Sequence, residues 1–267
     1  MIKTVIYGAA GRMGRRLVAN VLENSDFTLS GAVEYAGSPC LGTDAGILAG
    51  AGECGVPVTA GDDSVFASAD AVINFATAGV VECAEKAVAA NVAVVIGTTA
   101  LSADDKAKLQ ALADKGGRIV IASNMSVGVN LLFKLAREAT RILGDAYDVE
   151  IVEMHHNQKK DAPSGTAVTL AEVICDEKKW NYDSDVRHGR QGMVGSRTNR
   201  EIGMHSLRGG DVVGDHTVIF AVDGERIELT HKASSRDTFV RGALRAAKFL
   251  QDAPAGMYDM QDVLGLK

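Results

Sequence analysis

The chain has 267 residues, of which 46% are hydrophobic and 23% charged, the ordinary balance of a soluble globular enzyme. Only 5% of the residues are aromatic whereas 29 are glycine, and this composition favours an α/β fold over a β-sandwich. The formal net charge is −6 and no basic run is present, which excludes a general electrostatic attraction for nucleic acid or an anionic membrane.

The sequence also predicts the cellular setting. The opening residues, MIKTVIYGAAG, enter a strand and a glycine-rich turn directly, so we expect no cleaved signal peptide. No apolar stretch reaches about 18 residues, so we expect no transmembrane helix. Because the cysteines lack CxxC spacing, we expect reduced, mostly buried thiols in a cytoplasmic protein at Cys40, Cys54, Cys83 and Cys175.

In the first 125 residues, short apolar runs alternate with segments of helical period. A helix over 102–117 is expected to begin after Ser102 as its cap and to end at Gly116. Continuous apolar strands separated by helices predict a parallel sheet covered on both faces. The expected strands are 2–8, 27–34, 71–76, 93–97 and 118–123, and the other expected helices are 12–25 and 79–91.

The pattern changes after residue 126. We expect helices over 127–144 and from Ser164 to about 180, a polar loop over 181–200, and a final helix over 237–252 that closes the chain. Asp223-Gly224 predicts a tight hairpin between two strands of an antiparallel or mixed sheet. The expected strands of this sheet are 148–156, 201–209, 216–222 and 225–234.

These elements predict an α/β protein in two parts. Residues 1–126 with 236–267 are expected to form a Rossmann-like, parallel-sheet domain that binds a dinucleotide. Residues 127–235 are expected to form an α+β domain with a mixed or antiparallel sheet, which binds substrate and mediates oligomerisation.

A glycine pattern indicates where a dinucleotide binds. Gly8, Gly11 and Gly14 form G-x-x-G-x-x-G between the first strand and the first helix, where side chains would block the turn, the pyrophosphate or the helix–strand packing. Glu34 ends the second strand, at the position from which a carboxylate accepts hydrogen bonds from ribose hydroxyls. A structural turn with a solvated glutamate is the alternative reading.

Tyr35 bears on the choice of cofactor. Enzymes that use a 2′-phosphorylated cofactor are better served by a cation at this position, so Tyr35 favours NADH over NADPH. Three nearby arginines leave NADPH open, because any of them could reach a 2′-phosphate: Arg12, Arg15 and Arg16.

Two further segments follow expected strands at their carboxyl ends, the edge at which open α/β sheets bind ligands. The first is GTT, made of Gly97, Thr98 and Thr99. The second is ASNM, made of Ala122, Ser123, Asn124 and Met125. Each alone could be an ordinary loop, but their shared position predicts contacts to the cofactor.

The segment EMHHNQKKDAPSGTA, residues 153–167, concentrates chemically useful groups. An imidazole exchanges protons near neutral pH, and an ammonium donates a proton or holds a carboxylate. Hydroxyls and backbone N–H groups at a helix start can hold an anionic carboxylate. We predict no metal site, because adjacent strand residues His155 and His156 point to opposite faces. The alternatives are a plain N-cap at Ser164 and a solvated lysine pair.

Together these motifs resemble the 4-hydroxy-tetrahydrodipicolinate (formerly dihydrodipicolinate) reductase family. The resemblance runs in order through both expected domains, in GAAGRMGRRL, SNMSVGVNLL, the segment 153–167, GDVVGDHTVIF, ERIELTHKASSR and YDMQDVLGL. It implies NAD(P)H-dependent reduction of 4-hydroxy-tetrahydrodipicolinate, with loss of water, in the diaminopimelate route to lysine. It also implies a dicarboxylate substrate and a homotetramer.

The resemblance assigns roles to the matching positions. His155 is implied to be the proton donor or acceptor and Lys159 the proton donor. Substrate binding is implied for His156, Ser164, Gly165 and Thr166. Cofactor binding is implied for Gly8, Ala9, Ala10, Gly11, Arg12, Met13, Glu34, Gly97, Thr98, Thr99, Ala122, Ser123, Asn124 and Met125.

Three positions depart from the family's pattern. Tyr35 replaces a basic residue, residues 75–78 lack a proline-containing turn, and Ala100 replaces a glycine. Two other functions are also considered. A dehydrogenase acting on aspartate-like substrates would not need the cluster at 153–167, and a dinucleotide sensor would bind NADH without oxidising it.

Overall fold

The computed structural model of the chain describes residues 1–98 and 101–267. The chain divides into two compact units, the first made of residues 1–126 and 236–267 and the second of residues 127–235. Within the described residues, no helix is both long enough and apolar enough to cross a bilayer. The four cysteines are free thiols, but only Cys83 and Cys175 are buried, so the expectation of mostly buried thiols holds for half of them.

The first unit is built on a seven-stranded sheet in which every pair of neighbours is parallel, as the sequence predicts. The strand order β12-β6-β5-β4-β1-β2-β3 places β1 between β4 and β2, where the direction of strand addition reverses. The strands are β1 (Ile2–Tyr7), β2 (Phe27–Val33), β3 (Val58–Thr59), β4 (Ala71–Asn74), β5 (Ala93–Ile96), β6 (Arg118–Ile121) and β12 (Gly256–Tyr258).

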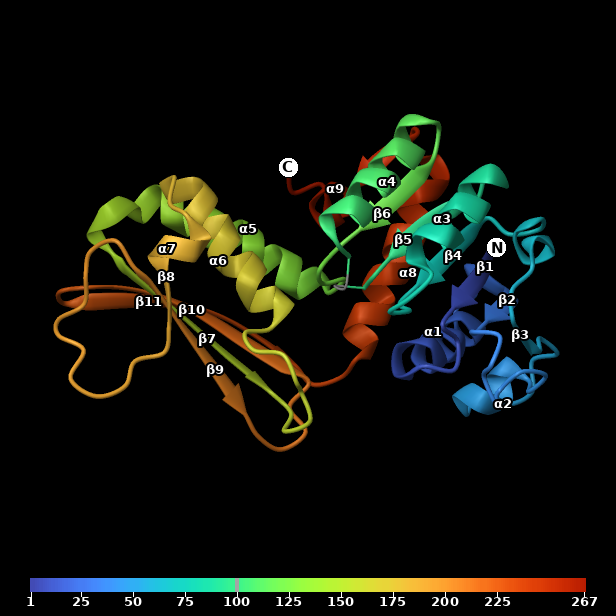
Figure 1. The fold of residues 1–267 in the computed structure, drawn as a ribbon, viewed down its shortest axis with the longest axis horizontal. Helices are drawn as coiled ribbons and strands as arrows, with labels where there is room; N and C mark the ends of the chain where they lie inside the picture. The colour runs from blue at the N-terminus through green and yellow to red at the C-terminus, as the bar shows by residue number, and fades with distance from the viewer. Residues whose placement is uncertain (99–100) are drawn as a thin grey trace. The chain divides into compact units, whose positions relative to one another are not determined.

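Helices cover both faces of this sheet (Figure 1). One apolar cluster joins the sheet to α1 (Arg12–Glu23) and α8 (Asp237–Asp252), and a second joins it to α3 (Val80–Ala89) and α4 (Ala103–Asp114). The central strands β4 and β5 are therefore buried on both faces, which explains their continuous apolar sequences. The short elements are α2 (Ala45–Ala49), α9 (Met260–Leu264) and the 3₁₀ turn Asp63–Phe66.

The predicted ends of α4 are confirmed. Ser102 and Asp105 form a reciprocal capping box at its start, and Gly116 follows its end with a φ of +107°. The expectation that α8 closes the chain is wrong, because β12 and α9 follow it and β12 extends the parallel sheet beside β6. Elements of three to five residues are too short to show a period in the sequence.

The second unit contains a mixed five-stranded sheet in the order β11-β10-β7-β9-β8. β10 runs antiparallel to both its neighbours, whereas β9 is parallel to β7 and β8. The predicted hairpin at Asp223-Gly224 is confirmed, because Val222 pairs with Glu225 across it. The strands are β7 (Asp148–His155), β8 (Val186–His188), β9 (Ile202–Arg208), β10 (Gly214–Val222) and β11 (Glu225–Ala233).

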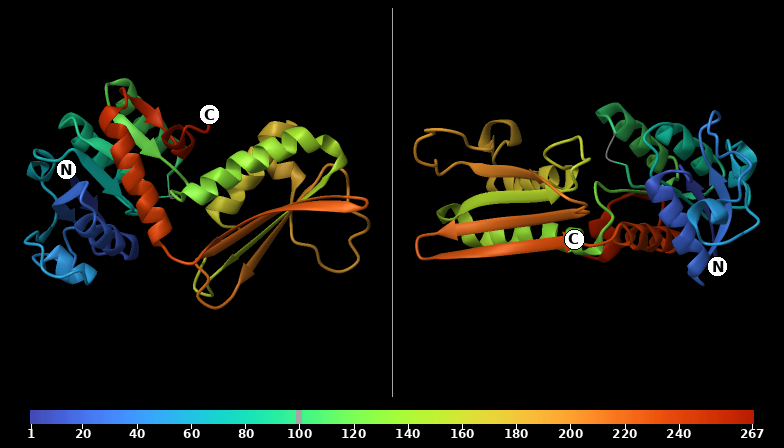
Figure 2. Two further views of the ribbon diagram at one scale, coloured as in Figure 1. Left: turned by 180° about the vertical axis from the view of Figure 1, so that it is seen from behind. Right: turned by 90° about the horizontal axis from the view of Figure 1, so that it is seen from below.

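The helices α5 (Val127–Leu143) and α6 (Gly165–Lys178) pack on one face of this sheet (Figures 1 and 2). Residues 127–235 place no helix on the other face. β7 alternates strictly between buried and partly exposed residues, as expected of a strand covered on one side. Two polar side chains, Glu153 and His155, occupy buried positions of this alternation near the end of the strand.

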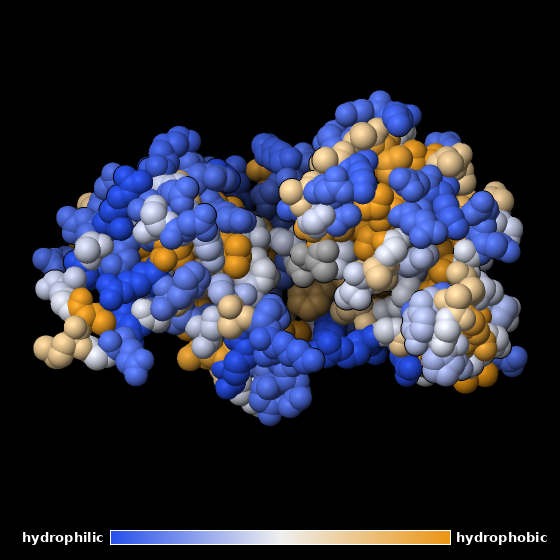
Figure 3. Space-filling view, in the orientation of Figure 1, coloured by the Kyte–Doolittle hydropathy of each residue, from blue (hydrophilic) through white to orange (hydrophobic). Residues whose placement is uncertain are grey.

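The segment 181–200 is only partly the loop that the sequence predicts. Asn181 caps α7 (Tyr182–Asp185), and β8 follows at once and pairs with β9. The remainder, 189–200, is irregular and is held to the sheet by two arginines, Arg190 and Arg197, that both bind Glu150. The surface of the second unit that Figure 3 shows is predominantly hydrophilic, with scattered hydrophobic residues.

Candidate functional site

The second unit brings four segments together at one end of its sheet. His155 ends β7 and lies opposite Arg208 at the end of β9. On the other side of β7, Glu153 lies opposite His216 near the start of β10. The loop after His155 leads to Ser164 and the start of α6. The predicted residues of segment 153–167 therefore surround the end of β7.

A buried carboxylate organises this cluster. Glu153 has no exposed surface, and its carboxylate lies 2.5 Å from His155 Nδ1. Arg208 donates to both carboxylate oxygens at 2.9 Å, and the Ser164 backbone N–H donates to Oε1 at 3.2 Å. Burial alone would raise the pKa of the Glu153 carboxyl, but the hydrogen bonds from His155 and Arg208 outweigh it and lower this pKa to about 2. Glu153 is therefore ionised at neutral pH.

A second histidine packs against the first. The rings of His155 and His216 meet edge to face with their centroids 5.2 Å apart, and His216 Nε2 lies 3.0 Å from the Ser164 hydroxyl. Burial, and next the charge of His155, lower the pKa of His216 to about 3. His216 is therefore neutral at neutral pH and shapes the site without adding charge.

The lowered pKa of His216 predicts a loss of stability in acid. Between pH 6.5 and 3 the unfolded chain binds a proton that the folded state excludes, so stability falls as the pH drops. Between pH 7 and pH 5, His216 is expected to remove up to about 2 kcal/mol from the free energy of unfolding. Urea unfolding at both pH values measures this, and His216→Asn should flatten the dependence. An equal loss in the variant would contradict the assignment.

The predicted proton donor lies in the loop after β7. Lys159 Nζ forms an ion pair with Asp161 at 2.9 Å, and its side chain is 19% exposed. Asp161 is largely exposed, and Arg208 ties the same loop to the sheet by donating to the Asp161 carbonyl at 2.7 Å. Lys160 is exposed. Of the two lysines, only Lys159 is thus partly sheltered and held in place.

The start of α6 has a structural role, and the sequence also predicts a binding role for it. The Ser164 hydroxyl accepts from the Ala167 N–H at 3.2 Å and caps the helix, which is the plain reading that the sequence left open. Gly165 and Thr166 follow in the first turn, at the positive end of the helix dipole. His156 is partly buried, directly beyond β7. Substrate binding by His156, Ser164, Gly165 and Thr166 stays a prediction.

The glycine-rich turn lies in the first unit, between β1 and α1. Gly8 has a φ of +79°, a conformation that favours glycine. A Cβ on Gly14 would lie 2.0 Å from the Gly8 carbonyl oxygen, so α1 can approach the turn only with glycine there. The predicted need for glycine at position 14 therefore comes from helix–turn packing inside the protein, and not from contact with a ligand.

The backbone N–H groups of this turn are divided between the fold and a ligand. Those of Gly8 and Ala9 donate to Val33, and that of Ala10 donates to the Glu34 carboxylate at 3.0 Å. The Gly11 N–H donates to Gly8. Among the described residues, the N–H groups of Arg12 and Met13 in the first turn of α1 have no backbone partner outside the helix. A helix start with available N–H groups fits a pyrophosphate.

Glu34 lies where the sequence places it, directly after β2. Its carboxylate accepts from the Ala10 and Tyr35 N–H groups, which fixes it beside the glycine-rich turn. Of the three arginines that leave NADPH open, Arg16 forms a two-point ion pair with Asp237 and Arg15 donates to the Ala10 carbonyl. Arg12 is exposed. Tyr35 is also exposed, next to Glu34.

The two other predicted cofactor segments follow β5 and β6, at the same edge of the sheet as the turn. A Cβ on Gly97 would lie 2.3 Å from the ring of Phe75, so this glycine first makes room for a neighbouring side chain. Thr98 and Met125 are buried, and Ala122 and Asn124 are partly so. Ser123 is exposed, whereas Thr99 and the departure at Ala100 lie outside the described residues.

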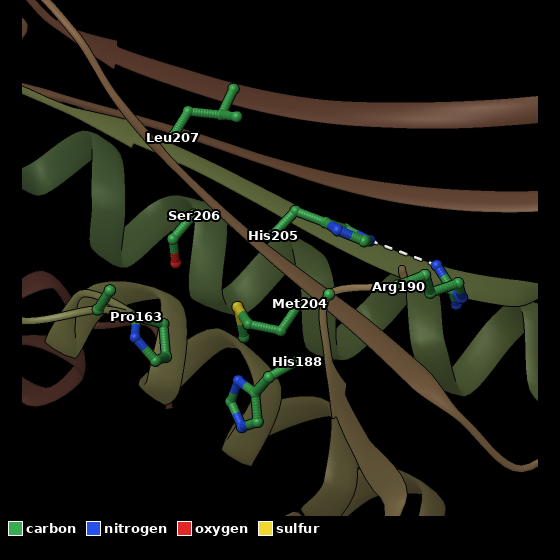
Figure 4. Close-up of a pocket in the computed structure, with 9 residues that line it drawn as sticks. Pro163, His188, Arg190, Met204, His205, Ser206 and Leu207 are labelled. Atoms are coloured by element: carbon green, nitrogen blue, oxygen red, sulfur yellow. Dashed lines mark hydrogen bonds between the residues drawn. The ribbon is translucent and has the colours of Figure 1, made fainter. Parts of the chain in front are cut away.

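A separate groove of about 430 Å³ borders the loop that precedes α6 (Figure 4). It contains none of the predicted site residues, and its cation Arg190 is already paired with Glu150 and Glu201. In residues 1–98 and 101–267, no cluster of three or more His, Cys, Asp or Glu side chains could hold a metal ion. The groove is lined by Ala162, Pro163, His188, Gly189, Arg190, Met204, His205, Ser206 and Leu207.

Four residues of the site were not singled out from the sequence. Glu153, Arg208, Gly214 and His216 all lie within quoted motifs or beside them, but no role was derived for them. A charged or polar residue at a buried position of an alternating strand is the signal that identifies Glu153 and His216. No such signal exists for Gly214, where a Cβ would lie 3.0 Å from His155 Nε2, because this proximity depends on the neighbouring strand.

Comparisons with known proteins cover the whole chain. Residues 2–125 match the family profile described as dihydrodipicolinate reductase, N-terminus, and residues 128–264 match the corresponding C-terminus profile. A 4-hydroxy-tetrahydrodipicolinate reductase of Syntrophotalea carbinolica is 49% identical over 268 residues, covering 100% of both chains. One from Anaeromyxobacter dehalogenans is 50% identical, covering 100% of this chain and 99% of the relative.

One solved structure is similar to this chain over nearly the whole length of both proteins. It is a dipicolinate-bound dihydrodipicolinate reductase from Paenisporosarcina sp. TG-14, with a TM-score of 0.75 and 25% identity, covering 98% of each chain. The same two-part architecture therefore occurs in a protein that binds a cyclic dicarboxylate.

Proposed function

The chain belongs to the dihydrodipicolinate reductase family, and from this premise we propose that the cluster at the end of β7 binds and protonates the substrate. The protein is an NAD(P)H-dependent oxidoreductase that reduces 4-hydroxy-tetrahydrodipicolinate to tetrahydrodipicolinate, with loss of water, in the diaminopimelate route to lysine. This function is supported most strongly by the sequence identity of 49–50% to named reductases, in alignments that cover 100% of this chain.

The glycine-rich turn, the start of α1 and Glu34 fit a nicotinamide dinucleotide, which supplies a hydride when bound. Hydride addition at C4 of the conjugated imine moves electron density towards the ring nitrogen, and a proton is then needed on the ring carbon adjacent to C4 to give the imine of tetrahydrodipicolinate. We assign the donation to Lys159 and the exchange of a proton to His155 Nε2. An ammonium can donate a proton, and an imidazole can donate or accept one.

Binding of the substrate's two carboxylates is assigned to the same cluster. The N–H groups of Gly165 and Thr166 lie at the positive end of the α6 dipole, which favours an anion. His156 and Ser164 border this helix start. Removing two carboxylates from water requires such matched donors, because an unpaired buried charge is costly.

The cofactor preference is proposed to be NADH. Tyr35 places no cation beside Glu34, and Arg16 is engaged with Asp237. The remaining cofactor contacts proposed are Gly8 to Met13 and the segments after β5 and β6, Gly97 to Thr99 and Ala122 to Met125.

Tyr35→Arg is expected to shift the preference towards NADPH, because a guanidinium beside the adenosine ribose can pair with a 2′-phosphate. The ratio of kcat/KM for NADPH to that for NADH should rise by about tenfold or more, given about 1.4 kcal/mol for one added charge-assisted contact. Tyr35→Phe is the matched control, because it keeps the ring and adds no charge. An unchanged ratio in the arginine variant would show that this position does not determine the preference.

We also propose a cytoplasmic homotetramer. The face of the five-stranded sheet opposite α5 and α6 carries no helix within residues 127–235, and Leu207, which lies on that face opposite Met154, is exposed. A sheet face of this kind is a suitable surface for self-association. Light scattering on the purified protein should give four times the mass of the 28.0 kDa chain.

A coupled assay tests the reaction. The condensation product of pyruvate and aspartate semialdehyde is generated in place, and the consumption of NADH and NADPH is followed separately. We expect oxidation of both cofactors only when the condensation product forms. Binding of NADH without oxidation would instead favour a dinucleotide sensor.

A further inference from the structure

We infer that Glu153 is a positioning residue, which fixes the ring of His155 and keeps a proton on its Nδ1 so that Nε2 faces the substrate. This inference rests on the proposed function, which gives His155 a proton to exchange. Glu153 itself does not touch the reacting atoms.

The strand geometry places the two side chains together. Glu153 and His155 are two residues apart on β7 and therefore point to the same face of the sheet. The distance of 2.5 Å between Oε2 and Nδ1 is short for a hydrogen bond, and both side chains are buried. The ring is thereby held at one nitrogen, leaving the other directed away from the carboxylate.

The direction of this hydrogen bond follows from the state of the carboxylate. Arg208 and the Ser164 N–H already donate to the Glu153 oxygens, as expected for an ionised group. An ionised carboxylate only accepts hydrogen bonds, so the proton between the two residues belongs to Nδ1 of His155. In a neutral ring with Nδ1 protonated, Nε2 carries the lone pair that can take up a proton.

Arg208 neutralises the charge of the carboxylate that orients the His155 ring. The Arg208 guanidinium forms an ion pair with the buried Glu153 carboxylate through two hydrogen bonds. The ring of His155 therefore contacts an ion pair and not an isolated negative charge. Exchanging the Glu153 carboxylate for an amide changes the volume little, replaces one acceptor oxygen with an NH2 donor, and leaves Arg208, whose side chain is 21% exposed, without its anionic partner. Orientation can therefore be tested at Glu153 without emptying the site.

The surroundings of Nε2 are kept open by a glycine. Gly214 begins β10 and lacks a positive φ, so its backbone does not require glycine. A Cβ there would lie 3.0 Å from His155 Nε2 and 3.6 Å from His216. The missing side chain thus leaves space beside the nitrogen to which we assign proton exchange.

Glu150 offers a matched control on the same strand. It lies on the opposite face of β7 and, like Glu153, contacts a histidine and arginines, with His205 Nε2 at 2.8 Å and Arg190 at 2.7 Å. Burial alone would raise the pKa of the Glu150 carboxyl, but these hydrogen bonds outweigh burial and lower this pKa to about 2, as for Glu153. Glu150→Gln therefore repeats the chemistry of Glu153→Gln away from His155.

The first experiment is ¹⁵N NMR of the imidazoles in the unmodified protein, at a pH where the His155 ring is neutral. The signal of His155, identified by its loss in His155→Gln, is expected to show Nδ1 protonated and Nε2 unprotonated. A ring protonated on Nε2 would overturn the inference. This measurement needs no substrate and no turnover, so it stands even if the proposed reaction fails.

The second experiment compares Glu153→Gln with Glu150→Gln in the coupled assay. Glu153→Gln should lower kcat by about 10²-fold or more with an unchanged KM for NADH, and should mix the two His155 tautomers, because the amide can present its NH2 donor to Nδ1 and so favour the ring protonated on Nε2. Glu150→Gln should change kcat less than threefold. A folded Glu153→Gln protein with kcat within fivefold of the unmodified enzyme would overturn the inference. If that variant does not fold, Glu153→Asp, which keeps the charge, replaces it under the same criteria.

Discussion

Replacing His155 with glutamine is expected to lower kcat by about 10²–10⁴-fold, the usual contribution of a general acid or base. Glutamine keeps a polar side chain at the end of β7 but cannot exchange a proton near neutral pH. Glu153 would retain Arg208 and the Ser164 N–H, so no buried charge is left unpaired and the fold should persist. The coupled assay measures kcat, and circular dichroism checks folding.

His188→Gln is the control for this change. His188 is an exposed histidine on β8 in the same unit, outside the cluster at the end of β7, so its replacement should leave kcat unchanged. A folded His155→Gln protein whose kcat falls less than fivefold would remove His155 from the chemistry.

Lys159→Met is expected to have a comparable effect, a loss of about 10²–10⁴-fold in kcat, because the variant lacks the proposed proton donor. Methionine retains the apolar part of the side chain. Asp161, which loses its partner, is largely exposed and can be solvated, so stability should change little. Steady-state kinetics should show an unchanged KM for NADH, since the first unit is unaltered.

A variant of the neighbouring Lys160 distinguishes a specific role of Lys159 from an effect of the overall charge of the loop. Lys160→Met removes the same charge from an exposed position of the same loop and should retain nearly full activity. Equal losses in the two variants would point to the overall charge of the loop. A loss of less than fivefold in Lys159→Met would contradict its role as proton donor.

The long elements could be predicted from the sequence because their patterns are local. The continuous apolar runs of β4 and β5 and the alternation along β7 each reflect which faces of a sheet are covered. The Ser102 cap and the Asp223-Gly224 turn are likewise determined by a few adjacent residues. Short elements such as β8 and β12 could not be predicted, because they depend on pairing with a distant strand.

The site could be predicted only as far as its residues are consecutive. The segment 153–167 contains the proposed proton donors and the start of α6 in one run. Arg208 joins it by pairing with His155 in the strand register, and Gly214 lies beside His155 at the start of β10. Both are more than fifty residues further along the chain, which no local pattern reveals. The sequence likewise does not show that Gly97 lies against the ring of Phe75, because these two residues are on neighbouring strand ends.

The distribution of the backbone donors also required the structure. The sequence places Gly8 to Met13 together as one phosphate-binding turn. Four of these N–H groups are engaged by the protein itself, and only the first turn of α1 remains for an anion. Similarly, the pairing of Arg16 with Asp237 removes one candidate for a 2′-phosphate contact.

We expect the cluster at the end of β7 to hold the dicarboxylate substrate. A crystal structure of the protein with NADH and dipicolinate tests it most directly, since dipicolinate is bound by a similar reductase. We expect one carboxylate at hydrogen-bond distance from the Gly165 and Thr166 N–H groups, with Lys159 Nζ and His155 Nε2 facing the ring. Dipicolinate bound elsewhere, with those two groups directed away from it, would contradict the account.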